Sequence, residues 1–305
     1  MNSNFEKKQI NKIYSDDLIE FPDFKTYISN LTELENFPFE NLTVREIYDK
    51  YHDLAKILPS VFQMLNHEEF NEEFFYRARI GIDRKKEDIS LKQTYSYPPT
   101  SVCSENQRAN IKNKSVFYCS NDPNCAMLEV KPKIDSEGYL SVWKGNAKKP
   151  VKLGILLPYD LPAENEWNTM AKSTFEYLEN SLQKETLDKI NHFMALYKFI
   201  PDRFVKEEKP YHLTSMISNE LLYGELWRDF IIYPSVASKT YMCNMAFHPN
   251  FVNENLKFVK VIKYKVYDIK NEQAKFNLGK VGYLKENRMV WRDATEEETK
   301  LFEKE

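Results

Sequence analysis

The chain has 305 residues, enough for one large domain or for a domain with an appendage. Its hydrophobic fraction of 42% supports a real core, and its net charge of -3 gives no electrostatic reason to expect nucleic acid or a membrane as a partner. The polar start and the lack of a long apolar run in the sequence predict neither a signal peptide nor a membrane span, so we expect a cytoplasmic protein.

The first part of the chain is expected to be helical. Thr43 and Glu46 have the spacing of a capping box, in which each side chain satisfies the backbone amide of the other residue. Apolar residues then recur at helical spacing over residues 47–58, and a second helix is predicted over 61–69. We interpret residues 1–72 as an N-terminal helical extension, either a core-packing addition or a partner-binding module.

The remaining chain, residues 73–305, alternates between groups of strands and helices. Runs of β-forming residues predict strands at 74–80, 115–120, 139–143, 151–157, 230–235, 240–247 and 258–268. Asp122 followed by Pro123 has the pattern of a helix start. One long helix or two shorter ones are predicted over 164–198, ended by Pro201, and another helix over 213–224. Long helices between groups of strands favour the α+β class.

Neither a metal nor a bound cofactor is predicted. The four cysteines are widely spaced and form no C-x-x-C pair, so we expect small buried residues and no zinc site. The 7 glycines form no nucleotide-binding loop, so recognition of phosphate would depend on side chains.

Three arginines and a tyrosine are candidate ligand-binding residues. Arg77 and Arg79 alternate along one predicted strand and therefore point to the same face, where planar guanidinium groups suit phosphate oxygens. Exposed strand arginines without a ligand have the same pattern. Arg108 lies ahead of the next strand, and Tyr118 near the end of that strand could stack on a flat base or hydrogen-bond a sugar.

A carboxylate and two polar residues complete the candidate site. Glu129 has apolar neighbours on both sides, and a carboxylate in such a position costs free energy unless something binds it, although a glutamate on a solvated helix face fits the same spacing. Ser235 follows an apolar strand and is expected at the mouth of a pocket. No histidine is placed to activate this serine, so we interpret it as a hydrogen-bond donor, with Asn244 on the next strand supporting it.

These positions together resemble the RES domain family, named for an arginine, a glutamate and a serine. The resemblance covers about residues 73–270 and is carried by the segments FYRAR, RANIKNKSVFYCSNDPNCAMLE and YPSVASKTYMCN. It implies a mixed sheet of the ADP-ribosyltransferase type with flanking helices. It also implies that Glu129, Tyr118, Ser235 and Arg77, with Arg79 as the rival arginine, are the catalytic residues, and that Arg108 binds substrate.

The resemblance implies an enzyme that breaks the nicotinamide–ribose bond of NAD, as a glycohydrolase or phosphorylase, with NAD as its substrate. The reaction passes through an oxocarbenium-like sugar that a carboxylate stabilises. Similar proteins commonly act as growth-arresting toxins, which implies a cognate antitoxin protein as a partner.

Two alternatives are kept. One is transfer of ADP-ribose to a protein target, which Met127, two residues before Glu129, disfavours because transferases of this type often have an acidic residue there. The other is a catalytically silent RES-fold interaction module.

Overall fold

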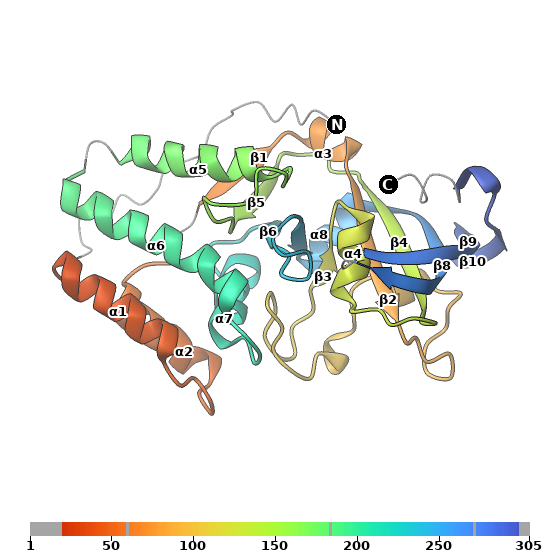
Figure 1. Ribbon diagram of the computed structural model, residues 1–305, viewed down its shortest axis with the longest axis horizontal. Helices are drawn as coiled ribbons and strands as arrows, with labels where there is room; N and C mark the ends of the chain where they lie inside the picture. The colour runs from red at the N-terminus through yellow and green to blue at the C-terminus, as the bar shows by residue number, and fades with distance from the viewer. Residues whose placement is uncertain (1–19, 59–60, 183–184, 271–272, 299–305) are drawn as a thin grey trace. The chain divides into compact units, whose positions relative to one another are not determined.

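The computed structural model describes residues 20–58, 61–182, 185–270 and 273–298 (Figure 1). The chain is mixed α+β, which confirms the predicted class, and it divides into two compact units. Unit 1 is formed by Met1–Met64, Thr100–Lys114 and Lys152–Pro234, and unit 2 by Leu65–Pro99, Ser115–Val151 and Ser235–Glu305. Within the described residues, no helix combines the length and the apolar character that crossing a membrane requires.

Unit 1 is mainly helical. Its helices are α1 (Phe24–Asn36), α2 (Val44–Ala55), α5 (Asn168–Ser181), α6 (Leu187–Lys206) and α7 (His212–Tyr223), with a short 3-10 turn, η2, at Thr100–Val102. Three adjacent strands follow the order β1 (Phe62–Leu65), β5 (Val151–Ile155) and β6 (Phe230–Pro234), and β5 pairs with β6 in parallel.

The N-terminal helices are part of the core of unit 1. The predicted capping box at the start of α2 is confirmed, since the Thr43 amide donates to Glu46 Oε2 at 2.7 Å and the Glu46 amide donates to Thr43 Oγ1 at 3.3 Å. Helix α1 lies beside α2 and α6, and α2 beside α7 (Figure 1). The buried guanidinium of Arg203 on α6 pairs with Glu35 of α1.

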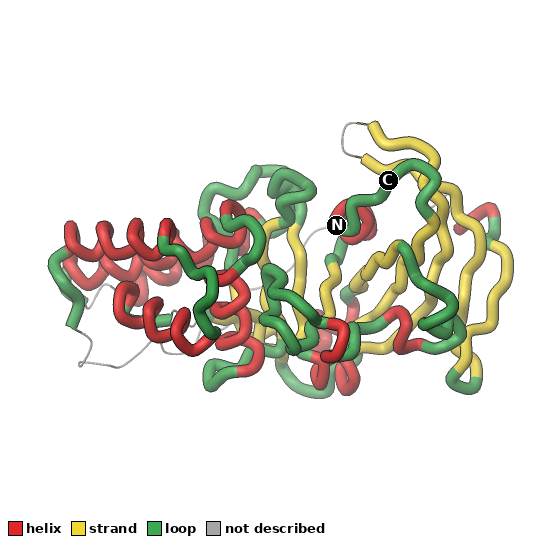
Figure 2. Tube along the Cα trace, turned by 90° about the horizontal axis from the view of Figure 1, so that it is seen from below, coloured by secondary structure: helices red, strands yellow, loops and turns green. Residues whose placement is uncertain are grey.

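Unit 2 is built around an antiparallel sheet of five strands. Their order is β10 (Arg288–Asp293), β9 (Gln273–Lys285), β8 (Leu256–Lys270), β4 (Glu137–Gly145) and β2 (Phe74–Ile80). A second antiparallel pair, β3 (Phe117–Cys119) and β7 (Cys243–Phe247), adjoins β2 through a bridge between Tyr76 and Ser120. The strands of the sheet are drawn as yellow tubes in Figure 2.

Short helices complete unit 2: α3 (His67–Glu72), η1 (Lys92–Tyr95), α4 (Pro123–Glu129) and α8 (Pro249–Asn255). Helix α4 covers one face of the sheet, where Ala126 and Met127 pack against an apolar cluster that includes Ala78 and Ile262. The opposite face carries the aromatic rings of Phe75, Trp143 and Phe258, which make edge-to-face contacts with one another and with Phe117 and Phe247 of the β3–β7 pair.

Two sequence-based predictions of secondary structure are wrong. Residues 61–69 do not form one helix, because strand β1 comes first and Asn66 then caps the start of α3 by accepting a hydrogen bond from the Glu68 amide. Pro201 does not end α6, which continues to Lys206. The sequence patterns also gave no indication of α8, β9 and β10.

Candidate functional site

Three of the predicted site residues meet at one carboxylate oxygen in unit 2. Ser235 Oγ and Asn244 Nδ2 each donate a hydrogen bond to Glu129 Oε1 at 2.6 Å. Ser235 is completely buried and Asn244 is 8% exposed, whereas Glu129 is an exposed residue. No described residue donates a hydrogen bond to the second oxygen, Oε2. The carboxylate is therefore fixed through one oxygen, and the other can accept a bond from a ligand.

Helix α4 places Glu129 at this point. Asp122 caps the helix, its Oδ1 accepting from the Cys125 amide at 2.9 Å, and Pro123 occupies the first turn, as predicted. Glu129 lies one turn after Cys125 and ends the helix, so both side chains project from the same side of α4. The side chain of Cys125 is buried below the carboxylate, beside Asn244.

A closed loop positions Ser235. The Ser235 amide donates to Met242 O at 2.9 Å and the Thr240 amide to Ser235 O at 2.8 Å, which closes residues 235–242 into a tight loop. The Ser238 amide donates to Ser235 Oγ at 3.2 Å, so the serine hydroxyl accepts from the backbone and directs its own proton to Glu129. Sequence reasoning missed Ser238, whose hydroxyl donates to Ser235 O at 3.1 Å and accepts from the Met242 amide at 2.9 Å; serine hydroxyls that bond to the backbone are typical of turns.

Tyr118 lies on the same face of the β3–β7 pair as Asn244. The register pairs Tyr118 with Ala246, and Asn244, two residues before Ala246, shares its face because strand side chains alternate. Tyr118 is half-buried. The aromatic side chain of Tyr118 thus lies on the face of this pair that also carries Asn244, which bonds to Glu129.

The predicted arginines make their contacts elsewhere. Arg77 donates from Nη1 to Tyr118 O and from Nε to Ser96 O, each at 3.0 Å. Its guanidinium lies over the Phe117 ring, on the face of β3 opposite to Tyr118. Arg79 forms a two-bond ion pair with Glu87, at 2.6 and 3.0 Å, and also donates to a main-chain carbonyl.

Arg108 belongs to unit 1. It donates to Phe204 O at 2.7 Å, and its guanidinium lies 4.6 Å from the centre of the Tyr211 ring. The structure thus brings together Glu129, Ser235 and Asn244 and leaves the substrate-binding roles of the three arginines as predictions.

The thiols near the site form no disulfides. Cys119, Cys125 and Cys243 are buried free cysteines, and burial raises the pKa of Cys125 to about 12. A thiolate nucleophile is not available at neutral pH from such a group. In the part of the chain that the structure describes, no three His, Cys, Asp or Glu side chains gather as a metal site would require.

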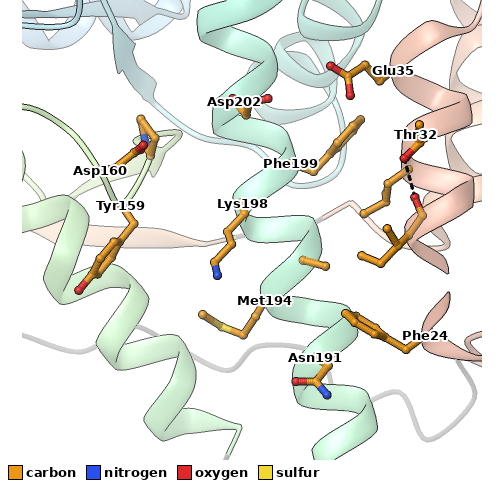
Figure 3. A pocket seen from close by; sticks show the side chains of 14 residues that line it. Phe24, Thr32, Glu35, Tyr159, Asp160, Asn191, Met194, Lys198, Phe199 and Asp202 are labelled. Atoms are coloured by element: carbon orange, nitrogen blue, oxygen red, sulfur yellow. Dashed lines mark hydrogen bonds between the residues drawn. The ribbon is translucent and has the colours of Figure 1, made fainter.

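Unit 1 contains a cavity of about 730 Å³ between α1, α6 and the segment around Tyr159 (Figure 3). Apolar side chains such as Phe24 and Phe199 line it together with Glu35, Lys198 and Asp202. A second cavity of about 760 Å³ lies beside α2. None of the candidate site residues predicted from the sequence lines either cavity.

Comparison with known proteins gives no family assignment: no protein-family model matches the chain, and no curated protein sequence matches it significantly.

Proposed function

We propose that the Glu129 site in unit 2 cleaves the bond between nicotinamide and ribose in NAD. The observation that supports this proposal most is the carboxylate held at one oxygen by two neutral donors, Ser235 and Asn244. Neutral donors fix the position of the group without cancelling its charge. The proposal includes an ADP-ribosyltransferase-like arrangement of the sheet and α4, consistent with the mixed α+β architecture.

The chemistry needs few groups. As the glycosidic bond breaks, positive charge develops on the ribose, and a nearby carboxylate stabilises it. In this proposal Glu129 supplies that charge and its Oε2 accepts a hydrogen bond from a ribose hydroxyl. Tyr118, on the same face as Asn244, offers an aromatic surface to the nicotinamide ring. Nicotinamide leaves as a neutral molecule, so no acid has to protonate it, and among the described residues no histidine is bonded to Glu129.

Water or phosphate is the proposed acceptor of the ADP-ribosyl group. Met127, which occupies the position of the second acid in many protein-modifying transferases, is 2% exposed and belongs to the apolar cluster under α4. An acidic side chain at this position would be buried in that cluster, so transfer to a protein is the less supported reaction. Loss of NAD in the cytoplasm would arrest growth, and a cognate antitoxin protein would hold such an activity in check.

Product analysis tests the proposal. The purified protein is incubated with NAD, with and without inorganic phosphate, and the products are separated by chromatography. We expect nicotinamide together with ADP-ribose, or with its 1″-phosphate when phosphate is present. Label from adenine-labelled NAD appearing on protein would favour transfer, and NAD that stays intact under all conditions would refute the proposed function.

A further inference from the structure

A buried thiol lies directly behind the amide that holds the carboxylate. Cys125 Sγ is 3.6 Å from Asn244 Oδ1 and 3.5 Å from Cys243 O, both within hydrogen-bond range for sulfur. The Cys243 carbonyl already accepts a short bond from Ser120 Oγ, at 2.7 Å. That carbonyl can accept a second bond, so the thiol has two acceptors within reach, the Cys243 carbonyl and the oxygen of the Asn244 amide.

The orientation of the Asn244 amide decides whether a hydrogen-bond donor or an acceptor faces Glu129. An asparagine amide rotated by half a turn occupies the same space but exchanges its donor and acceptor ends. In the observed orientation Asn244 Nδ2 donates to Glu129 Oε1 at 2.6 Å. In the rotated one, two acceptors, the amide oxygen and the carboxylate, would face each other. A thiol donor at Oδ1 favours the observed orientation.

Because the Cys125 thiol is buried, it keeps its proton and can donate a hydrogen bond. Cys125 has no exposed surface, and desolvation raises its pKa to about 12, so the sulfur carries its proton throughout the neutral range. A charged thiolate at the same place would repel both the amide oxygen and Glu129.

We propose that Cys125 is a positioning residue, whose thiol fixes the Asn244 amide with its donor end toward Glu129. Its effect on turnover rests on the proposed function, whereas its effect on Asn244 does not. The bonds run in one direction, from the thiol of α4 to the amide of β7 and from the amide back to the last residue of α4.

Two replacements separate the hydrogen bond from packing. Cys125→Ser keeps a donor of similar size, whereas Cys125→Ala removes it. We expect Cys125→Ala to lower kcat for NAD cleavage about 3- to 10-fold, the value of one modest hydrogen bond, with little change in KM. Cys125→Ser should retain more of the wild-type kcat than Cys125→Ala does. Cys119→Ala, which removes a buried thiol on β3 and leaves α4 unchanged, is the matched control and should leave kcat near wild type.

A double-variant cycle with Asn244→Ala tests the coupling itself. In the Asn244→Ala background, Cys125→Ala should change kcat by less than about 2-fold, because the effects of replacing two residues in one hydrogen-bond network do not add. The same cycle is measured on the urea midpoint of unfolding, which needs no substrate. If the wild type does not cleave NAD, the proposed function fails and the unfolding cycle alone decides on Cys125. Additive effects of the two replacements on the midpoint would overturn the proposal, as would a Cys125→Ser variant no better than Cys125→Ala.

Discussion

Ser235 and Asn244 hold the same oxygen of Glu129, each at 2.6 Å, and their loss should affect turnover in the same way. Ser235→Ala removes one donor and leaves the carboxylate able to turn away from the sugar. We expect kcat to fall about 10- to 100-fold, as when one of several preorganised groups is removed. Steady-state kinetics with NAD measures the change, and Ser173→Ala, on α5 of unit 1, is the control. Wild-type kcat in folded Ser235→Ala protein would contradict a positioning role.

The contacts of Arg77 with two backbone carbonyls favour a role in stability, whereas the family resemblance predicts a role with substrate. Its guanidinium satisfies the carbonyls of Tyr118 and Ser96 with two different nitrogens. Lysine can reach one carbonyl at most, so Arg77→Lys should lower the free energy of unfolding by about 1 kcal/mol and leave the KM for NAD unchanged. Urea unfolding and steady-state kinetics test both statements. A raised KM with unchanged stability would instead assign Arg77 to the pyrophosphate.

Helix α4 is short, and its cap therefore matters to the position of Glu129. Asp122→Ala removes the acceptor for the Cys125 amide and should cost about 1 kcal/mol of stability. Because the helix that carries Glu129 would fray from its first turn, we also expect a lower kcat. Thr186→Ala, which removes the cap of α6 in unit 1, is the matched control. Thr186→Ala should lower the free energy of unfolding, measured in urea, by a similar amount and leave kcat unchanged. An equal loss of kcat in both variants would contradict the link between the α4 cap and Glu129.

Glu298, close to the last residue that the structure describes, makes a pH-dependent contact in unit 2. Hydrogen bonds from Arg292, with smaller contributions from Thr295, Tyr283 and Lys260, lower the pKa of Glu298 to about 2. A carboxyl whose pKa is lower in the folded state stabilises the fold above its unfolded value, near 4.5, and loses that contribution as the pH falls toward 2.

Glu298→Gln should therefore reduce stability at neutral pH by about 1 to 2 kcal/mol, since bonds to a charged group are replaced by weaker ones. The difference in stability between the variant and the wild type should shrink as the pH falls from about 4.5, the unfolded pKa, to about 2, the folded pKa. Urea midpoints across this range measure it, with Glu297→Gln as the exposed neighbouring control. A difference that stays constant with pH would show that packing, not charge, is responsible.

Elements with strong local signals were predicted, and those that depend on distant contacts were not. The cap at Asp122 and the capping box at Thr43 are confirmed because both depend on side chains within one turn. Pro201 gave the wrong end for α6 because its neighbours are buried, and packing outweighs one lost backbone bond. The apolar alternation of strand β9 changes phase after Leu278, next to Gly279, so its pairing with β8 and β10 defines it as one strand.

The same distinction holds for the site. Glu129, Ser235 and Asn244 could be selected from the sequence because each lies in, or directly after, a recognisable helix or strand. Their meeting at one oxygen could not be derived, since α4 is separated from the end of β6 and from β7 by more than a hundred residues. The partners of Arg77 and Arg79 are mostly backbone carbonyls, for which the sequence has no pattern.

At the scale of the whole molecule, the chain passes between two units several times. Each unit is assembled from three separate stretches, and no composition change marks the crossings. That residues 1–72 form a separable extension stays a prediction, but α1 and α2 share a core with α6 and α7 in unit 1. The proposed site, in contrast, draws all of its hydrogen-bonding residues from unit 2.

The central claim is that the charge of Glu129 drives the breaking of the nicotinamide–ribose bond. Its most direct test is the rate of nicotinamide release from NAD by the wild type, by Glu129→Gln and by Glu72→Gln, an exposed glutamate on α3 of the same unit. The account predicts release by the wild type and by Glu72→Gln, and a loss of about 10² to 10³ in rate for Glu129→Gln, whose circular dichroism should stay that of the folded protein. Release at the wild-type rate by folded Glu129→Gln protein would contradict it.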